Sequence, residues 1–265
     1  MKLAPKHDHL KSISWFSCLC ICLTILTAAP ALAKDNLKGA PATWDKPYAG
    51  IALGYAFGKA DPTVNTQSNA YFNAQDIRQL DPLGSRDLEA ENFTGTLFGG
   101  FNHQIDNFVI GLEGDFTLGN FDKEYDTGDI EYASLPGRNF NIESKVSSYW
   151  MASIRPRVGY SFDNSLISLS AGPALSEFEY TWKFRDGLPE SNELSKNNVK
   201  LGWAAGISYE QIISDGWGLK FDFLHYDFDN IVDASSSLSA NPTDGFNHHL
   251  DYQTNEIRLG VFKTF

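Results

Sequence analysis

The stretch YAGIALGYAFG, residues 48–58, alternates between large and small side chains from Gly50 onward. From Ile51 to Phe57 its odd-numbered positions are bulky, and from Gly50 to Gly58 its even-numbered positions are glycine or alanine. Successive side chains of a strand point to opposite faces, so a period of two is typical of a β-strand. This segment therefore predicts a strand with one bulky face and one small face.

The same period recurs in seven further segments. We expect eight strands in all, at residues 48–59, 92–104, 108–119, 147–161, 165–178, 198–212, 217–228 and 250–265. Short turns at residues 105–107, 162–164 and 213–216 alternate with four longer connections. This is the layout of an outer-membrane barrel. The sequence predicts an all-β, eight-stranded antiparallel up-and-down transmembrane β-barrel, with short periplasmic turns and four long extracellular loops.

Charge lies on the strand faces opposite the bulky apolar ones. In residues 108–119, Phe108, Ile110 and Leu112 share one face, and Glu113 and Asp115 share the other. A soluble barrel or sandwich, the alternative fold, would turn its larger apolar side chains inward. We favour the membrane barrel, because lipid outside and a polar lumen explain this pattern on five strands, and closure removes the sheet edges that lipid could not satisfy.

The charged positions on the inner face are expected to form one layer, because most lie five to nine residues from the short-turn ends of their strands. The expected members are Glu113, Asp115, Arg155, Arg157, Lys200, Glu210, Lys220, Asp222, Glu256 and Arg258. Buried charge is costly unless it is paired, and five acids balance five bases here. An eight-stranded barrel is only wide enough for its own side chains. The sequence therefore predicts an ion-pair plug rather than a conducting path.

Residues 1–33 are predicted to be a secretory signal peptide. A lysine-containing start, an apolar run over residues 13–26 and the small residues Ala31-Leu32-Ala33 are typical of such a segment, with cleavage after Ala33. An uncleaved N-terminal anchor is the alternative. We expect residues 34–47 to form a short periplasmic segment and residues 48–265 to form the barrel. All three cysteines precede residue 34, so the exported chain is expected to lack disulfides.

The charge of the chain argues against nucleic-acid binding. Residues 1–33 contain three lysines and one aspartate, so their removal changes the formal net charge from −12 to −14. Nucleic-acid binding depends on neutralising phosphates with basic side chains. The sequence also contains no phosphate-binding loop, catalytic cysteine or metal-ligand spacing, so we do not expect an enzyme.

Several motifs resemble one family. The residues are Trp44 with the strand from Tyr48, NHQIDNFVIGLEGDF (102–116), RPRVGYSFDN (155–164), LGWAAGISYEQIISDGWGLKFDFLHYDF (201–228) and the terminal Phe265. They are similar to the small outer-membrane β-barrels of α-proteobacteria, the opacity-like porin-family group, which includes surface antigens and haemin-binding proteins. Pro156 and Pro173 depart from the family pattern, and we expect a β-bulge near them because each removes a ladder donor.

The resemblance implies a protein of the cell outer membrane in Gram-negative bacteria. Its partners would be outer-membrane lipid, lipopolysaccharide and the barrel-assembly machinery, for which Phe265 would be the assembly signal. The expected role is structural and surface-exposed, supporting envelope integrity, and the loops could contact host or environmental ligands. A narrow porin is one alternative.

A haemin-binding surface receptor is the other alternative. His248 and His249 are expected in a loop before the last strand, near Tyr252. Histidine and tyrosine are usual axial ligands of haem iron. No other cofactor is expected.

Overall fold

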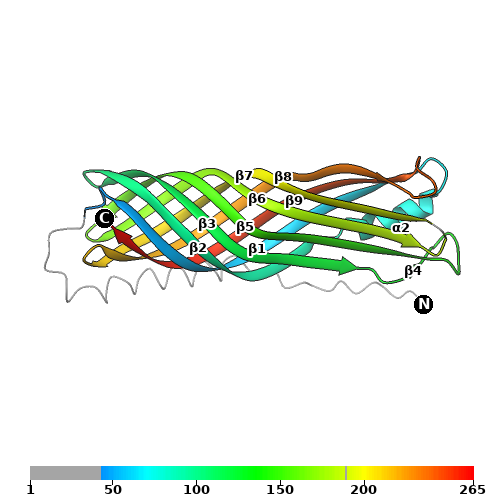
Figure 1. Ribbon diagram of the computed structural model, residues 1–265, viewed down its shortest axis with the longest axis horizontal. Helices are drawn as coiled ribbons and strands as arrows, with labels where there is room; N and C mark the ends of the chain where they lie inside the picture. The colour runs from blue at the N-terminus through cyan, green and yellow to red at the C-terminus, as the bar shows by residue number, and fades with distance from the viewer. Residues whose placement is uncertain (1–42, 189) are drawn as a thin grey trace, which may run out of the picture. The chain divides into compact units, whose positions relative to one another are not determined.

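The computed structural model describes residues 43–265 except residue 189. Eight long strands form a closed antiparallel ring (Figure 1). They are β1 (Pro47–Gln67), β2 (Leu88–Ile105), β3 (Phe108–Asp126), β5 (Asn139–Phe162), β6 (Ser165–Asp186), β7 (Ser191–Ser214), β8 (Trp217–Ser237) and β9 (Gly245–Thr264). Strand β1 pairs with β9 over its whole length, which closes the ring. The predicted barrel is confirmed, whereas the predicted signal peptide lies outside the described residues.

Three tight turns join the strands at one end of the barrel, which we call the turn end. They lie between β2 and β3, between β5 and β6, and between β7 and β8, where the sequence predicts them. Asp106, Asp163 and Asp215 adopt φ angles of 53°, 52° and 51°. Aspartate tolerates this left-handed conformation because its short side chain can bond to the local backbone.

Strands extend into all four predicted long loops. At the opposite end, the loop end, β1 continues to Gln67, β6 continues to Asp186 and β9 begins at Gly245. The remaining connections are residues 68–87, which contain helix α2 (Ala74–Gly84), residues 127–138, which contain the short strand β4 (Ile130–Glu131), and residues 187–190 and 238–244. The barrel is therefore longer than predicted, and its loops are shorter.

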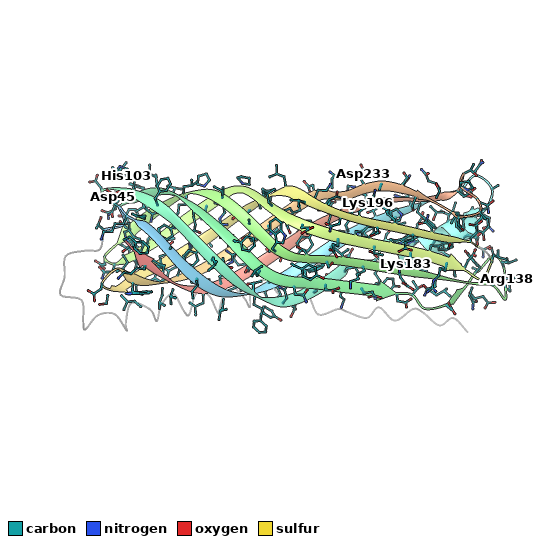
Figure 2. All side chains as sticks on the ribbon, in the orientation of Figure 1. Asp45, His103, Arg138, Lys183, Lys196 and Asp233 are labelled. Atoms are coloured by element: carbon teal, nitrogen blue, oxygen red, sulfur yellow. The ribbon has the colours of Figure 1, made fainter. Side chains whose placement is uncertain are left out.

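The hydrophobic face of the strands changes sides partway along the barrel. Near the turn end of β6, Leu169 and Leu175 point outward and are exposed, at 59% and 43%. Farther along the same strand, Phe178, Trp182 and other even-numbered aromatic residues point inward and are buried. This change indicates that lipid surrounds the turn-end half, which we call the apolar band, and that water surrounds the loop-end half. Figure 2 shows charged side chains, among them Lys183 and Asp233, on the outside of the loop-end half.

The loop-end half is built as two sheets that face each other. Pairing between β2 and β3 stops at Thr94↔Gly119, and pairing between β7 and β8 stops at Trp203↔Asp227. Pairing between the other neighbours continues toward the loop end. One sheet therefore contains β2, β1, β9 and β8, and the other contains β3, β5, β6 and β7. Aromatic side chains fill the space between them, and Trp182 and Phe246 pack with ring centroids 4.5 Å apart.

The four loop-end connections bind one another. Helix α2 begins with a capping box between Asn73 and Asp76, and Gln79 of this helix donates a 2.9 Å hydrogen bond to the carbonyl oxygen of Glu131. The Arg138 side chain donates to the carbonyl oxygen of Gly187 at 3.1 Å. The Glu190 carboxylate accepts a hydrogen bond from the backbone N–H of Ala240, which joins residues 187–190 to residues 238–244. The Asp244 carboxylate accepts one from the backbone N–H of Asn69, which joins residues 238–244 to residues 68–87. No helix among the described residues is long and apolar enough to cross a membrane.

Asp244 should make the contacts among the four loop-end connections acid-sensitive. Its buried carboxylate accepts hydrogen bonds of 2.7, 3.1 and 3.0 Å from the backbone N–H groups of Asn69, Ala70 and Tyr71. Burial opposes ionisation, but these bonds outweigh it and lower the pKa of Asp244 to about 2. The ionised Asp244 carboxylate thus stabilises the contacts with residues 69–71 fully above the ordinary aspartate pKa of about 4, and this stabilisation is lost as the pH falls toward 2.

Pepsin digestion tests this effect, because pepsin is active across that pH range. Cleavage near Phe72 should rise between pH 4 and pH 2 in the wild type. In Asp244→Asn this segment should already be loose at pH 4, and its cleavage should show no such additional rise. Equal cleavage profiles for the two proteins would contradict the role assigned to Asp244.

Pro156 and Pro173 interrupt the ladder between β5 and β6 without changing its register. Pairing stops at Ser153↔Ala174 and resumes in the same register at Arg157↔Ser170. The irregularity in this pair of strands lies instead toward the loop end, between residues 147 and 151. Next to Pro173, the Ile154 carbonyl oxygen approaches Gly172 so closely that a Cβ atom there would lie only 2.2 Å away. The two strand backbones therefore approach each other closely beside the missing donor, and only glycine fits at position 172 without a clash.

Gly172→Ala should destabilise the folded barrel by about 1–3 kcal/mol, because the added methyl group forces two strand backbones apart. Urea unfolding in lipid vesicles measures this change. Gly95→Ala is the matched control, because a Cβ atom at Gly95 meets no atom within 4 Å. Equal stabilities of the two variants would show that the close approach at Gly172 is unimportant.

Candidate functional site

Nine charged side chains meet inside the turn-end half of the barrel. They come from β3, β5, β7, β8 and β9, and all are buried: Glu113, Asp115, Arg155, Arg157, Glu210, Lys220, Asp222, Glu256 and Arg258. Strand register brings opposite charges together, since Glu113 lies across from Arg155, Glu210 from Lys220, and Asp222 from Arg258. We call these nine residues the ion layer.

Glu113 is the centre of one half of the ion layer. Its carboxylate lies 3.0 Å from Arg155 Nη2 and 3.0 Å from Arg157 Nη1, and it also contacts Lys220. The Tyr48 hydroxyl donates a 2.6 Å hydrogen bond to the same carboxylate. Arg157 also contacts Glu210, so it joins two carboxylates from different strands. Charge-assisted bonds of this kind hold the strands at a fixed separation.

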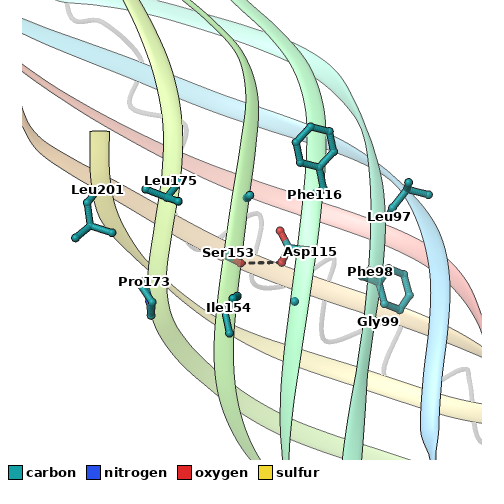
Figure 3. A pocket seen from close by; sticks show the side chains of 12 residues that line it. Leu97, Phe98, Gly99, Asp115, Phe116, Ser153, Ile154, Pro173, Leu175 and Leu201 are labelled. Atoms are coloured by element: carbon teal, nitrogen blue, oxygen red, sulfur yellow. Dashed lines mark hydrogen bonds between the residues drawn. The ribbon is translucent and has the colours of Figure 1, made fainter. Parts of the chain in front are cut away.

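Asp115 and Arg258 form the other half. The Arg258 guanidinium lies 3.6 Å from the Asp115 carboxylate and 2.7 Å from that of Glu256. The Ser153 hydroxyl donates to Asp115 at 2.9 Å, as Figure 3 shows. Arg155 contacts both Asp115 and Glu113. This arginine therefore links the two halves into one network.

Neutral polar side chains complete the ion layer, and the sequence interpretation did not include them. Tyr48 accepts a 2.6 Å hydrogen bond from Arg157, and Tyr226 accepts one of the same length from Arg258. The Ser208 hydroxyl donates to Asp222 at 2.5 Å. All three lie on the inner face of their strands, so the same period of two could have identified them.

Lys200 does not join the ion layer, contrary to its predicted place. It lies on β7 beyond Trp203, where β7 no longer pairs with β8. Its Nζ atom instead donates a 2.8 Å hydrogen bond to the carbonyl oxygen of Asn230 across this gap. The predicted balance of five acids and five bases thus becomes five acids and four bases.

Apolar residues close the lumen on both sides of the ion layer. Toward the turn end, a cluster contains Trp44, Tyr48, Ala52, Phe98, Val109, Leu166, Ile212 and Phe262. Toward the loop end lies the aromatic core between the two sheets, in which Phe178 packs on Phe228 and Tyr252 with ring centroids 5.1 Å apart in each case. The lumen thus holds three successive layers of its own side chains.

The predicted haem ligands do not face one common site. His248 and His249 lie within β9 rather than in a loop, so their side chains point to opposite faces of the sheet. His248 is buried, with Nδ1 lying 3.3 Å from the Tyr180 hydroxyl and Nε2 lying 2.9 Å from the Ser236 hydroxyl. Burial also lowers the pKa of His248 to about 4. Tyr252 lies in the aromatic core, so this geometry does not support a haem site of the predicted kind.

Phe265 lies at the turn end with its side chain exposed. Its backbone N–H donates to the carbonyl oxygen of Pro47 at 3.0 Å, so the terminal residue joins the end of β1. Among residues 43–265, leaving out residue 189, no group of three or more His, Cys, Asp or Glu side chains is arranged to hold a metal ion.

Curated relatives of the chain are outer-membrane proteins. The chain is 29% identical over 230 residues to a 31 kDa outer-membrane immunogenic protein of Brucella melitensis, which covers 82% of this chain and 89% of the relative. It is 23% identical over 246 residues to a 25 kDa outer-membrane immunogenic protein of Brucella abortus, and the match covers 88% of this chain and 90% of that relative. A 22 kDa outer membrane protein of Rhizobium leguminosarum is 22% identical, covering 72% and 74%.

Solved structures similar to the chain include two from enterobacteria. The outer membrane protease OmpT of Escherichia coli has a TM-score of 0.49 at 10% identity, covering 86% of this chain and 99% of the protease. Ail of Yersinia pestis has a TM-score of 0.33 at 13% identity, covering 83% and 99%. The family model for the outer membrane protein β-barrel domain matches residues 18–265. With this match over most of its length, the chain belongs to the outer membrane protein β-barrel domain family, and it is a protein of the outer membrane.

Proposed function

We propose that this protein is a non-conducting, non-enzymatic structural barrel that carries a rigid surface structure and supports envelope integrity. The three-layered lumen is the observation that carries the proposal. A conducting barrel needs a continuous polar path, whereas here apolar side chains lie above and below a charged layer in which each member contacts at least one opposite charge. Each buried charge has a partner, as the cost of burial requires.

The loop-end half, which lies on the extracellular side, suits a rigid surface structure. Its connections bind one another, and an aromatic core fills the space between its two sheets. Outer-membrane lipid and lipopolysaccharide would surround the apolar band, and the barrel-assembly machinery would insert the chain through its last strand and Phe265. Host or environmental ligands would meet the polar outer surface of the extracellular half.

Single-channel recording in planar bilayers tests the closed lumen. The folded protein, verified by heat-modifiable gel migration, should give no steady conductance, and a large general porin is the positive control. A large steady conductance from the folded barrel would contradict the proposal.

The envelope role is tested in cells. Removing the gene should make the cells more sensitive to detergent and chelator, and the wild-type gene should restore resistance. A gene lacking the codon for Phe265 should restore less, in proportion to the folded barrel found in the outer membrane. Unchanged resistance after gene removal would exclude the structural role.

A further inference from the structure

The apolar band contains a groove on its outer, lipid-facing surface. The groove has a volume of about 640 Å³ and crosses β2, β3, β5, β6 and β7 (Figure 3). Its walls include Leu97, Phe116, Ile154 and Leu201, which are 61%, 42%, 57% and 68% exposed. A convex barrel wall normally presents a continuous layer of side chains, so a hollow of this size is a distinct feature of the surface.

The hollow arises where bulky side chains are missing from the outer face. Gly99 and Gly114 lie directly opposite each other on β2 and β3, and Ala152 of β5, which lies across from Phe116, adds a third small side chain to the lining. At Gly114 a Cβ atom would meet nothing closer than 3.6 Å, so a side chain has room there. Behind the groove, Asp115 and Ser153 point into the lumen and are bonded to each other. The outward walls are therefore apolar.

We propose that this groove binds one acyl chain of an outer-leaflet lipopolysaccharide. Its position decides the occupant, since the groove lies within the band that faces hydrocarbon, and it reaches Leu201 near the loop-end margin of that band. The loop end is the extracellular side, so the part of the groove around Leu201 lies in the outer leaflet, and the groove runs from there toward Gly114 in the middle of the band. An acyl chain is narrow and flexible enough to follow apolar walls, and packing contacts in lipid supply the affinity.

Native mass spectrometry tests the proposal with the full exported chain in mild detergent and added lipid A as the probe. We expect one lipid A to remain on the wild type. Gly114→Leu should reduce the retained fraction by at least about tenfold, because leucine occupies the space of the chain. Gly95→Leu is the matched control, because Gly95 also has open space around it but does not line the groove, and it should retain lipid A as the wild type does.

Heat-modifiable migration verifies that each variant is folded before the measurement. The proposal is overturned if the wild type retains no lipid A, or if Gly114→Leu retains as much as Gly95→Leu. Retention of phosphatidylethanolamine in preference to lipid A would also overturn it, because the groove would then hold a phospholipid. A lipid-free wild-type dimer that Gly114→Leu converts to a monomer would assign the groove to a second copy of the chain.

Discussion

Replacing Arg157 by alanine should lower the free energy of unfolding of the barrel by about 3–5 kcal/mol. The Arg157 guanidinium is buried and contacts both Glu113 and Glu210. Its removal leaves these two carboxylates with Lys220 as their nearest cation. In an unhydrated lumen that loss is large, whereas in a water-filled lumen it would fall to that of an exposed pair, under about 1 kcal/mol.

Urea unfolding in lipid vesicles measures the change, and Lys200→Ala is the matched control. Lys200 is a basic residue of the barrel wall that lies outside the ion layer, so its replacement should change stability by less than about 1 kcal/mol. Adding Glu210→Gln to Arg157→Ala should recover part of the loss, because it removes one of the carboxylates left short of a partner. A near-neutral Arg157→Ala would show that water fills the lumen.

Trp182→Ala should destabilise the loop-end half by about 3–5 kcal/mol, as is usual when a buried tryptophan is truncated. The Trp182 side chain is fully buried between the two sheets, where it packs on Phe246 and, with ring centroids 4.8 Å apart, on His248. At this end the ladders between β2 and β3 and between β7 and β8 have stopped, so the two sheets are joined by aromatic packing and by the bonds among the loop-end connections. The cavity should therefore loosen the loop-end half and spare the apolar band.

Limited proteolysis of the folded protein distinguishes the two halves. In Trp182→Ala, cleavage should appear in β6 and β9 beyond the apolar band, while heat-modifiable migration of the membrane part persists. Lys183→Ala, on the neighbouring outward position, should change stability by no more than about 0.5 kcal/mol. Loss of the whole barrel in Trp182→Ala would show that the two halves unfold as one unit.

The amino-acid sequence by itself determined the strands of the apolar band and their turns. Alternation of side chains, as in residues 48–58, fixes which residues share a face, and aspartate-containing turns fix where the chain reverses. The alternation of side chains and the positions of the turns also predicted nine members of the ion layer. In an up-and-down barrel, the position of a side chain is set by the face of the strand on which it lies and by its distance from a turn.

The sequence pattern failed in the loop-end half for a physical reason. Where the surroundings change from lipid to water, the apolar face of a strand moves from outside to inside, and the change of phase resembles the end of a strand. On β6 the outward Leu175 is followed by the inward Phe178, so the predicted strand ended eight residues early, at 178 instead of Asp186. For the same reason, His248 was expected in a loop, although it lies in the aromatic core.

Only the tertiary structure decided which distant strands pair and where that pairing stops. Lys200 lies on the predicted inner face, yet it leaves the ion layer because β7 separates from β8 above Trp203. The groove at Gly114 likewise depends on how five strands are placed side by side, with Gly99, Gly114 and Ala152 lying between larger side chains of neighbouring strands. Alternation within a strand shows only on which face each side chain lies. The position of Lys200 and the groove at Gly114 depend instead on the register between strands and on where neighbouring strands separate, and only the folded barrel sets these.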